Sequence, residues 1–342
     1  MSLSQADLAL GRLAGAHRLC PRPEPFACFL ALEAISSSRI AGVHASLPDV
    51  LEAAVTDRSR DEASERTLCC IRALERASFR VERGTPLSLR LVREMHSALT
   101  DALRRPGSAP GEFRAGPAWI SSPDGRPETA RFVPPPVEEM GVALRAWESY
   151  VHDDSARLPL LVRYALVHYQ FETIHPFDDG NGRLGRLFIA LQLMESGILP
   201  APFLGLSGYF ARHKKEYYDR LQYVRERGEI EAWLRFFLAA VAHEATAFLE
   251  RAEQLSGLLA RYERELGGHR SRVAEVAGLL VERPVLTVRY VQERLGLSQP
   301  GATNLLRRLV EEGIAREEGS GPGTRHRWLG EAVLDILEPA AG

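Results

Sequence analysis

The sequence predicts a mainly α-helical protein, a helical bundle with a small β-hairpin flap and a C-terminal winged helix-turn-helix. Apolar residues recur at spacings of three and four along most of the 342 residues, which is the period of an amphipathic helix. Proline and glycine are concentrated in one irregular stretch, residues 104–136. Near the end, short helical segments precede two extended segments around a glycine-rich turn, which is the outline of a winged helix.

The composition is that of a globular protein and limits the function classes. Hydrophobic residues make up 45% of the chain and charged residues 26%, which argues against disorder. The 43 lysines and arginines nearly balance the 45 aspartates and glutamates, giving a net charge of −2, which excludes a wholly basic nucleic-acid coat. No run approaches the roughly 20 apolar residues of a membrane span, and the first residues show no secretory leader pattern. We therefore expect a cytoplasmic protein without a membrane partner.

The four cysteines, Cys20, Cys28, Cys69 and Cys70, show no CxxC spacing. Neither a zinc site nor a disulfide framework is predicted from this pattern. We expect reduced, partly buried thiols.

Long segments with helical apolar spacing and few internal prolines account for the chain before its tail. These segments are residues 27–40, 49–79, 87–103, 136–152, 158–174, 182–197, 207–227 and 229–265. The length predicts two or three domains. We divide the chain into an N-terminal helical region (1–86), a catalytic core (87–265) and the winged helix-turn-helix (266–342).

The tail begins where the helical pattern pauses, after residue 265. Residues 273–282, 287–295 and 299–312 predict three short helices. Residues 314–316 and 326–329 then flank a glycine-rich tip and predict a two-stranded ribbon. Three helices and a ribbon are typical of a winged helix-turn-helix.

The irregular stretch holds the predicted flap. Residues 118–121 and 129–133 have extended character on either side of a turn at residues 122–125. The residues that carry the flap are Trp119, Ile120, Ala130, Arg131 and Phe132. Long loops inside compact domains are usually functional, although a surface excursion without a role is the alternative.

The most informative segment runs from residue 158 to residue 198. Residues 160–174 are apolar on nearly all sides, which predicts a helix at the centre of a domain. Pro176 cannot continue that helix, so His175 is placed at its C-terminal end. Gly180 and Gly182 then lead into a second apolar helix, and a glycine-rich turn before a helix N-terminus is suited to binding phosphate.

The residues around this turn supply the other parts of a phosphate-handling site. Arg183 and Arg186 are three residues apart and leave the same face of the second helix. Asp179 offers a hard oxygen to Mg²⁺, the usual companion of a polyphosphate. His175 is a candidate general base. Each residue alone is most often a cap, a turn or a packed side chain, but the whole set predicts phosphoryl or nucleotidyl transfer.

Other nucleotide and metal motifs do not match. The Walker A pattern GxxxxGK(S/T) is absent, and no predicted strand precedes the turn as a Rossmann fingerprint requires. His168 and His175 are seven residues apart without the glutamate of HExxH, which argues against a metalloprotease.

From His175 to Arg183 the chain reads HPFDDGNGR, and Leu184-Gly185-Arg186 follows. This string resembles the signature of the Fic family, HPFx(D/E)GN(G/K)R with a trailing Gly-Arg. Residues 111–114 and 119–136 resemble the family's flap, and residues 208–218 its downstream helix. With the helical N-terminal region and the tail, nearly the whole chain resembles multi-domain bacterial Fic proteins.

The resemblance implies transfer of AMP from ATP to a Ser, Thr or Tyr hydroxyl of a protein target, including the chain itself. By the matching positions, His175 would deprotonate the hydroxyl and Asp179 would hold Mg²⁺. The flap would pair with the main chain of the target.

The remaining matched positions would bind the nucleotide. Arg183 would contact the β-phosphate and Arg186 the γ-phosphate. The α-phosphate would be held by the backbone amides of Gly180, Asn181 and Gly182. Tyr217 and Tyr218 would lie near the adenine, although helical aromatic residues are more often part of a core.

Many Fic proteins carry an inhibitory helix with the pattern (S/T)xxxE(G/N), whose glutamate pairs with the second arginine of the loop. Ser37 and Gly42 match the first and last positions, but Ala41 stands at the glutamate position. An alanine offers no charge or hydrogen bond, so we expect Arg186 to be free to bind ATP. The sequence either carries a Glu-to-Ala change or naturally lacks the glutamate. Because the family's glutamate also supports removal of AMP, that reverse activity should be weak.

A DNA-binding regulator is the alternative function. Polar and basic side chains of the tail could reach DNA bases or phosphates. These residues are Arg289, Gln299, Asn304, Arg307, Arg308, Arg325, His326 and Arg327. The tail also holds several glutamates, so its basic surface is thin. Winged helices also act as protein-docking modules. The sequence therefore leaves DNA at residues 271–329 and a homodimer open as further partners.

Overall fold

The computed structural model describes residues 2–19, 26–56, 59–101, 109–120, 124–153, 157–267, 271–319 and 326–338. Cys20, the first two residues of the predicted flap turn, Arg325 and the predicted wing tip lie outside the described residues. Helices dominate the described chain and its strands are short, so the mainly α fold is confirmed.

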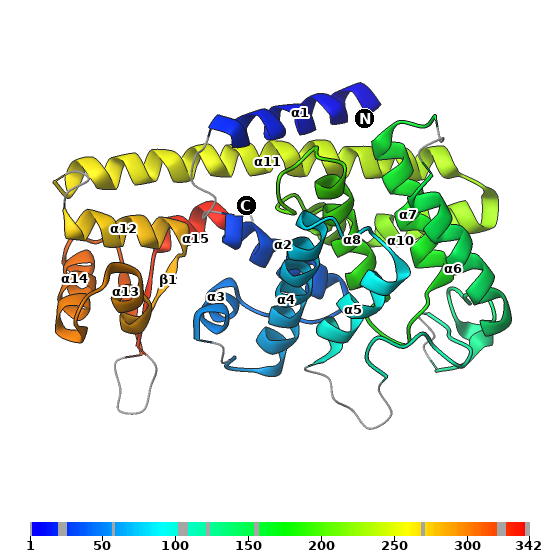
Figure 1. Ribbon diagram of the computed structural model, residues 1–342, viewed down its shortest axis with the longest axis horizontal. Helices are drawn as coiled ribbons and strands as arrows, with labels where there is room; N and C mark the ends of the chain where they lie inside the picture. Colours follow the sequence, from blue (N-terminus) through cyan, green and yellow to red (C-terminus); the bar gives the residue numbers. More distant parts are fainter. Residues whose placement is uncertain are drawn as a thin grey trace.

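The N-terminal region is a set of helices, of which α1 (Leu3–Leu19) lies on one side of the long helix α11 (Ile230–Glu265) and the others on its opposite side (Figure 1). The others are α2 (Phe26–Ile40), α3 (Leu47–Thr56), α4 (Glu62–Glu82) and α5 (Leu89–Thr100). Helix α1 lies along α11, whereas α2, α4 and α5 pack toward α8 (Asn181–Glu195). This region therefore reaches the segment that carries the predicted site.

The central part of the molecule is built around the hairpin of α7 and α8. Its elements are α6 (Val137–Val151), α7 (Leu160–Ile174), α8, α9 (Ser207–Arg212), α10 (Lys214–Arg227) and α11. Helix α8 is buried along almost all of its length, as its apolar sequence predicted. Such a helix is held by packing on every side, which fixes the position of the loop that precedes it.

Helix α11 is 36 residues long and runs along most of the molecule (Figure 1). By length and composition alone it could cross a membrane, but 56% of its most apolar stretch is buried inside the protein. A core helix passes the same test. Its continuous path joins the central part to the C-terminal unit, which we define as residues 271–319 and 326–338.

The C-terminal unit contains the helices and the ribbon that the tail predicts. Its elements are α12 (Arg272–Glu282), β1 (Val285–Leu286), α13 (Val288–Leu295), α14 (Gln299–Glu311), β2 (Arg316–Glu318), β3 (Arg327–Leu329) and α15 (Glu331–Leu337). The strands form one antiparallel sheet in the order β1-β3-β2, with Leu329 opposite both Val285 and Arg316. Strand β1 and helix α15 were not predicted, because a two-residue strand and a seven-residue helix give little periodicity.

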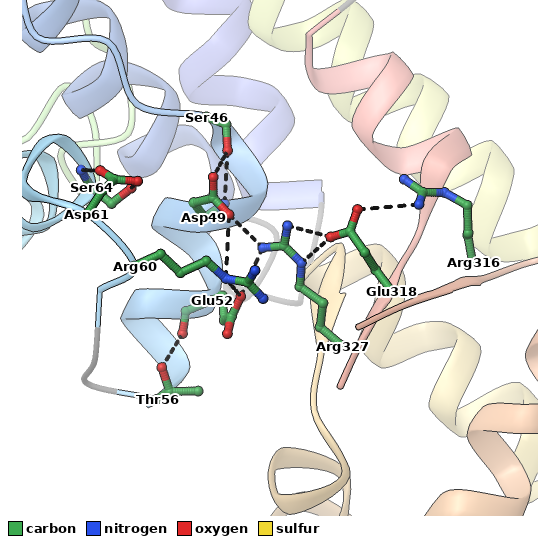
Figure 2. Close-up of polar contacts among 10 residues, drawn as sticks. All are labelled: Ser46, Asp49, Glu52, Thr56, Arg60, Asp61, Ser64, Arg316, Glu318 and Arg327. Atoms are coloured by element: carbon green, nitrogen blue, oxygen red, sulfur yellow. Dashed lines mark hydrogen bonds and ion pairs between the residues drawn. The ribbon is translucent and has the colours of Figure 1, made fainter. Parts of the chain in front are cut away.

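An ion-pair cluster attaches the C-terminal unit to α3 (Figure 2). Arg327 of β3 donates to Asp49 Oδ1 at 2.8 Å and to Glu52 Oε2 at 2.9 Å. It also donates to Glu318 of β2 at 2.6 Å. The side chains of Arg327 and Glu52 are 8% and 1% exposed, so this contact is buried.

Three predicted elements differ in the structure. The helix predicted for residues 49–79 is two helices, because Asp61 begins α4 as an N-cap that accepts from the Ser64 amide at 2.7 Å. The helix predicted for residues 207–227 is divided at His213 into α9 and α10. The flap is not a regular hairpin: it has one isolated bridge, between Ile120 and Phe132, and a short 3₁₀ helix at Pro127–Thr129.

The two predicted boundaries between the three domains stay a prediction. A single cluster of buried apolar residues extends through the N-terminal region, the central part and the C-terminal unit. Helix α11 ends at Glu265 and a turn follows at Leu266 and Gly267, close to the second expected boundary.

Candidate functional site

The end of α7 places His175 at the mouth of the α7–α8 hairpin. His175 has φ 49° and ψ 62°, and among the described residues it is the one non-glycine residue with positive φ. Its amide donates to Phe171 O at 2.9 Å and closes the last turn of α7. A non-glycine residue in this conformation costs roughly 1–3 kcal/mol and persists where its surroundings fix it.

Arg114 fixes the backbone of His175 from the other side. The Arg114 side chain donates through Nε to His175 O at 3.0 Å, and its amide donates to Pro176 O at 2.9 Å. Its other nitrogens donate to Gly116 O at 2.9 Å and Pro135 O at 2.5 Å. Arg114 is buried and thus connects both ends of the flap to the candidate base. Arg114 belongs to the segment that resembles the family's flap, but its contacts with His175 and Pro135 were not predicted.

The environment of His175 keeps its imidazole neutral. Burial lowers the pKa of His175 most strongly and the nearby charges of Arg225 and Arg114 act in the same direction, whereas the Glu172 carbonyl and Asp179 oppose them, so that the pKa is about 4. Nδ1 is buried and makes no hydrogen bond of normal geometry with a described residue. At pH 7 the ring is therefore able to accept a proton.

The loop after His175 is anchored in the core by Phe177, which has no exposed surface. Its ring stacks on His96 with the centroids 3.9 Å apart. The side chain of Asn181 accepts from Phe177 N at 2.9 Å and donates to Phe177 O at 2.7 Å. Because the Asn181 side chain is used in this way, only its backbone amide is available to a ligand.

His96 holds the loop through its ring nitrogens. Nδ1 accepts from Gly111 N at 2.9 Å, which leaves Nε2 to donate to Asp179 O at 3.1 Å. No sequence pattern indicated this role, because His96 lies on an ordinary amphipathic helix 83 positions from Asp179.

Glycines shape the backbone at the start of α8. Gly180 has φ +81°, and a Cβ there would lie 2.7 Å from a Leu99 side-chain carbon. A Cβ at Gly182 would lie 2.9 Å from Arg186 Nη1. No side chain among the described residues caps this helix, so the first amides of α8 keep their capacity to bind an anion.

Arg183 adds buried positive charge beside these amides. It is 2% exposed, and its Nη2 donates to Asp179 Oδ2 at 3.3 Å. Nε and Nη1 are buried without a hydrogen-bond partner among the described residues. Unpaired buried donors of this kind are costly, so Arg183 is suited to an anion that enters next to it.

Asp179 is the candidate metal ligand and stays accessible. Its side chain is 62% exposed, and Oδ1 accepts from Gly180 N at 2.6 Å. The described residues contain no group of three or more His, Cys, Asp or Glu that could hold a metal. A metal at this place would therefore depend on one carboxylate, water and phosphate oxygens, which is the donor set that Mg²⁺ usually takes with nucleotides.

Arg186 is not free, contrary to the prediction from Ala41. It is buried, and it donates through Nε to Ser37 Oγ at 3.0 Å and through Nη2 to Ser37 O at 2.9 Å. Ala41 and Gly42 are exposed just after the end of α2, and Gly42 has φ +81°. The expectation failed because the first residue of the motif, and not only the glutamate position, can bind the arginine.

Tyr217 is a core residue, which corrects its assignment to the adenine side. It has no exposed surface, and its ring stacks on Phe210 with the centroids 4.6 Å apart. Its hydroxyl donates to His168 Nε2 at 2.9 Å. His168 Nδ1 bonds to Gly185 O at 3.2 Å, so this pair positions α8. Tyr218 is partly exposed and stays a candidate.

The flap lies against α10. Arg131 pairs with Asp219 at 2.5 Å, and the ring of Phe132 lies 3.7 Å from the guanidinium carbon of Arg225. Trp119 is 40% exposed, while Ala130 is half-buried. The five predicted flap residues are thus brought together by the Ile120–Phe132 bridge.

Several arginines among the described residues of the C-terminal unit pair with glutamates of the same unit. Arg289 pairs with Glu293 at 2.7 Å and Arg308 with Glu312 at 3.6 Å. Arg327, which we expected on the surface of a wing, is instead buried against α3. A charged residue in a ribbon gives no sign of a partner 275 positions away.

Two family models match the chain. The Fic/DOC family model matches residues 86–193, and the Fic/DOC family N-terminal model matches residues 1–78. Together these segments cover more than half of the 342 residues. The first of them contains the whole α7–α8 site.

Curated relatives of the chain are also Fic proteins. The protein adenylyltransferase Fic of Aedes aegypti is 31% identical over 147 residues, which are 43% of this chain and 26% of that protein. The protein of the same name from Culex quinquefasciatus is 30% identical over 162 residues, 46% of this chain and 29% of that protein. The chain thus spans less than a third of the length of these relatives.

Two bacterial crystal structures share the fold. A Fic family protein from Desulfovibrio desulfuricans superposes with a TM-score of 0.59 and 18% identity, covering 96% of both chains. A Fic domain-containing signaling protein from Bacteroides thetaiotaomicron gives a TM-score of 0.56 and 17% identity, covering 72% of this chain and 97% of that one. At these identities the likeness concerns the fold alone.

Proposed function

Because the chain belongs to the Fic/DOC family, we propose that it transfers AMP from ATP to a hydroxyl group of a protein side chain. One observation carries the proposal. Arg183 is buried with two unpaired guanidinium nitrogens, beside a helix N-terminus that no described side chain caps. Both features favour an anion at the same place. The curated relatives named protein adenylyltransferase support this choice of anion.

The neutral imidazole of His175 accepts the proton of the target hydroxyl as its oxygen attacks the α-phosphorus of ATP. The bond from the α-phosphorus to the oxygen bridging it to the β-phosphorus breaks, and pyrophosphate leaves. The amides of Asn181 and Gly182 stabilise the charge that develops on the α-phosphate, and the Gly180 amide joins them when it exchanges its bond to Asp179 Oδ1 for one to the phosphate. Arg183 binds the β-phosphate by charge-assisted hydrogen bonds.

Arg186 is the candidate for the γ-phosphate, and its contact with Ser37 decides how that phosphate binds. The two hydrogen bonds to Ser37, at 3.0 and 2.9 Å, occupy the donors that the phosphate needs. Binding of the γ-phosphate therefore exchanges these bonds for stronger bonds to a charged oxygen.

Mg²⁺ fits the exposed carboxylate of Asp179, because this ion keeps water ligands and completes its shell with phosphate oxygens. Asp179 would hold the ion, which would neutralise part of the phosphate charge. The His96 contact to Asp179 O at 3.1 Å keeps this part of the loop in place.

The flap would present its backbone to an extended segment of the target. Such pairing positions a hydroxyl with little dependence on the neighbouring side chains, so self-modification is part of the proposal. The thiols of Cys28 and Cys70 are free and buried, which fits a reducing compartment and supports a cytoplasmic location.

Mass spectrometry after incubation with ATP and Mg²⁺ tests the proposed function. We expect a mass increase of one AMP on Ser, Thr or Tyr of the chain itself or of an added protein. The His175→Ala variant should show none while still binding nucleotide. A mass increase of one phosphate would replace AMP transfer by kinase chemistry, and an equal AMP increase in His175→Ala would remove His175 as the base.

A further inference from the structure

One side chain joins the flap to the turn that carries the candidate base. Arg225, in the last turn of α10, donates through Nε to Thr173 Oγ1 and through Nη2 to Glu172 O, both at 3.2 Å. Its guanidinium carbon lies 3.7 Å from the centre of the Phe132 ring in the flap. The edge of one planar group thus contacts α7 while its face contacts the flap.

The contact to α7 falls where that helix most needs a donor. The last four carbonyls of a helix have no partner within it. His175 N satisfies Phe171 O, and Arg225 satisfies Glu172 O from another helix. Because His175 follows three residues later in a strained left-handed conformation, a donor at this carbonyl stabilises the turn that aims the imidazole.

The contact to the flap involves the residue on which the flap is organised. Phe132 forms the one backbone bridge seen among the described flap residues, with Ile120, whose amide donates to Phe132 O at 2.8 Å. A ring on the face of a guanidinium leaves its N–H groups free in the plane. The stacking and the hydrogen bonds can therefore exist together and restrict the same rotamer of Arg225.

We propose that Arg225 is a positioning residue that couples the flap to His175. A target strand that pairs with the flap holds Phe132 against the guanidinium group, and that group then fixes the C-terminal turn of α7 with the imidazole aimed at the hydroxyl. The part of this inference that concerns catalysis, the aiming of His175 at the target hydroxyl, rests on the proposed function. The mechanical coupling between the flap and α7 does not depend on it.

Two other arginines of the flap region show why Arg225 has a distinct role. In the described structure, the side chain of Arg114 donates to backbone carbonyls at the two ends of the flap and at His175. Its contacts therefore hold these backbone segments in place independently of the flap side chains. Arg131 ties the flap to α10 through Asp219 at 2.5 Å, and no bond from its side chain to α7 is seen in the described structure. Arg131 is therefore a matched control, as a flap-to-α10 contact without the link to the base.

Hydrogen exchange of the peptide spanning residues 171–179, followed by mass spectrometry without nucleotide, tests the coupling. Arg225→Gln should speed exchange of this peptide roughly tenfold, the effect of losing charge-assisted bonds at a helix end. Phe132→Leu should speed it about threefold, the scale of one exposed cation–π contact. Arg131→Gln should leave it unchanged.

The double variant decides whether Phe132 acts through Arg225. If it does, Phe132→Leu adds nothing in the Arg225→Gln background, because the coupled contact is already lost. Unchanged exchange in Arg225→Gln, or equal effects of Phe132→Leu in both backgrounds, would overturn the proposal. Phe132 is partly buried and Arg131 is exposed, so their variants should fold. They keep the test valid even if Arg225→Gln folds poorly.

Kinetics form the second arm, with a tagged His175→Ala copy as the protein acceptor. Arg225→Gln should lower kcat for AMP transfer about tenfold without changing the Kd for ATP, because the contacts of Arg225 seen in the described structure are with α7, α10 and the flap and not with the phosphate site. Arg225→Lys keeps the charge and one donor, so it should restore most of kcat. Phe132→Leu should chiefly raise KM for the acceptor. If the wild type transfers no AMP, the proposed function fails while the exchange experiment still decides the coupling.

Discussion

The buried ion pair between β3 and α3 offers a prediction about how the C-terminal unit is held. Arg327 donates to Asp49 and Glu52 of α3 at 2.8 and 2.9 Å and to Glu318 at 2.6 Å (Figure 2). In Arg327→Met, a side chain of similar length keeps the apolar packing but removes the charge. Glu52, which is 1% exposed, would then lose one of its buried ion-pair partners, while Arg60, which is 38% exposed, still pairs with it at 2.8 Å.

The expected magnitude follows from this burial. Removing one partner of a fully buried ion pair costs about 3–5 kcal/mol, mainly because the other charge stays buried. Arg60 compensates part of this cost from the surface, where such pairs contribute at most about 1 kcal/mol. We therefore expect a loss of about 3 kcal/mol. If the protein unfolds as one unit, its Tm falls by roughly 6–12 °C.

Arg316→Met is the matched control. Arg316 lies on the neighbouring strand β2 and pairs with Glu331 at 2.5 Å, but its side chain is 50% exposed, so its removal should cost less than about 1 kcal/mol. Urea unfolding monitored by circular dichroism measures both variants. Equal, small losses for the two would show that the Arg327 cluster is not buried in solution and would refute the reasoning.

Three further outcomes test the site. Ala41→Glu supplies the carboxylate that the motif lacks, and self-labelling from ATP should fall at least tenfold as this carboxylate competes with the γ-phosphate for Arg186; unchanged labelling would contradict this role of α2. Gly180 has φ +81°, and a Cβ there would lie 2.7 Å from the buried side chain of Leu99. Gly180→Ala should therefore destabilise the protein by about 2 kcal/mol and weaken ATP binding measured by calorimetry. Gly197→Ala is the control: with φ +71° and open space around the added Cβ, it should cost about 1 kcal/mol of stability and leave ATP binding intact. The pKa of His175 near 4 predicts that AMP transfer persists below pH 6 and falls only through about pH 4, whereas a rate midpoint near pH 6.5 would show an exposed imidazole. Because the imidazole of the unfolded chain binds its proton at about pH 6.5, the free energy of unfolding should also decrease as the pH falls from 6.5 to 4.

The parts of the site that could be predicted are those set by adjacent residues. Pro176 must end α7, and Gly180 must precede α8, so the sequence determines the loop and the place of His175. The apolar character of the two helices on all sides predicts their burial. These signals act over a few positions and need no knowledge of the rest of the fold.

The parts that could not be predicted depend on contacts between distant segments. His96 and Arg114 reach the loop, and Arg225 the end of α7, from 83, 61 and 53 positions away. Residues 111–114 marked Arg114 as part of the flap segment, but no local pattern indicated which groups these three side chains would contact. The burial of Tyr217 likewise depends on its stacking against Phe210 and its bond to His168.

Regular patterns also concealed irregular structure. The apolar spacing of residues 49–79 continues through a break that the Asp61 cap produces. The sequence of the flap predicts a hairpin, but Pro127 lacks an amide hydrogen and begins a 3₁₀ turn. Strand-like pairing among the described flap residues is therefore limited to the bridge between Ile120 and Phe132.

The most direct measurement incubates the protein with Mg²⁺ and ATP labelled with ³²P in either the α or the γ position, beside the His175→Ala variant. Transfer of AMP predicts that protein-bound label comes from α-labelled ATP alone, that γ-label is released as pyrophosphate, and that the variant stays unlabelled. Label on protein from γ-labelled ATP, or the absence of label with wild-type protein that binds ATP, would contradict nucleotidyl transfer at the α7–α8 loop.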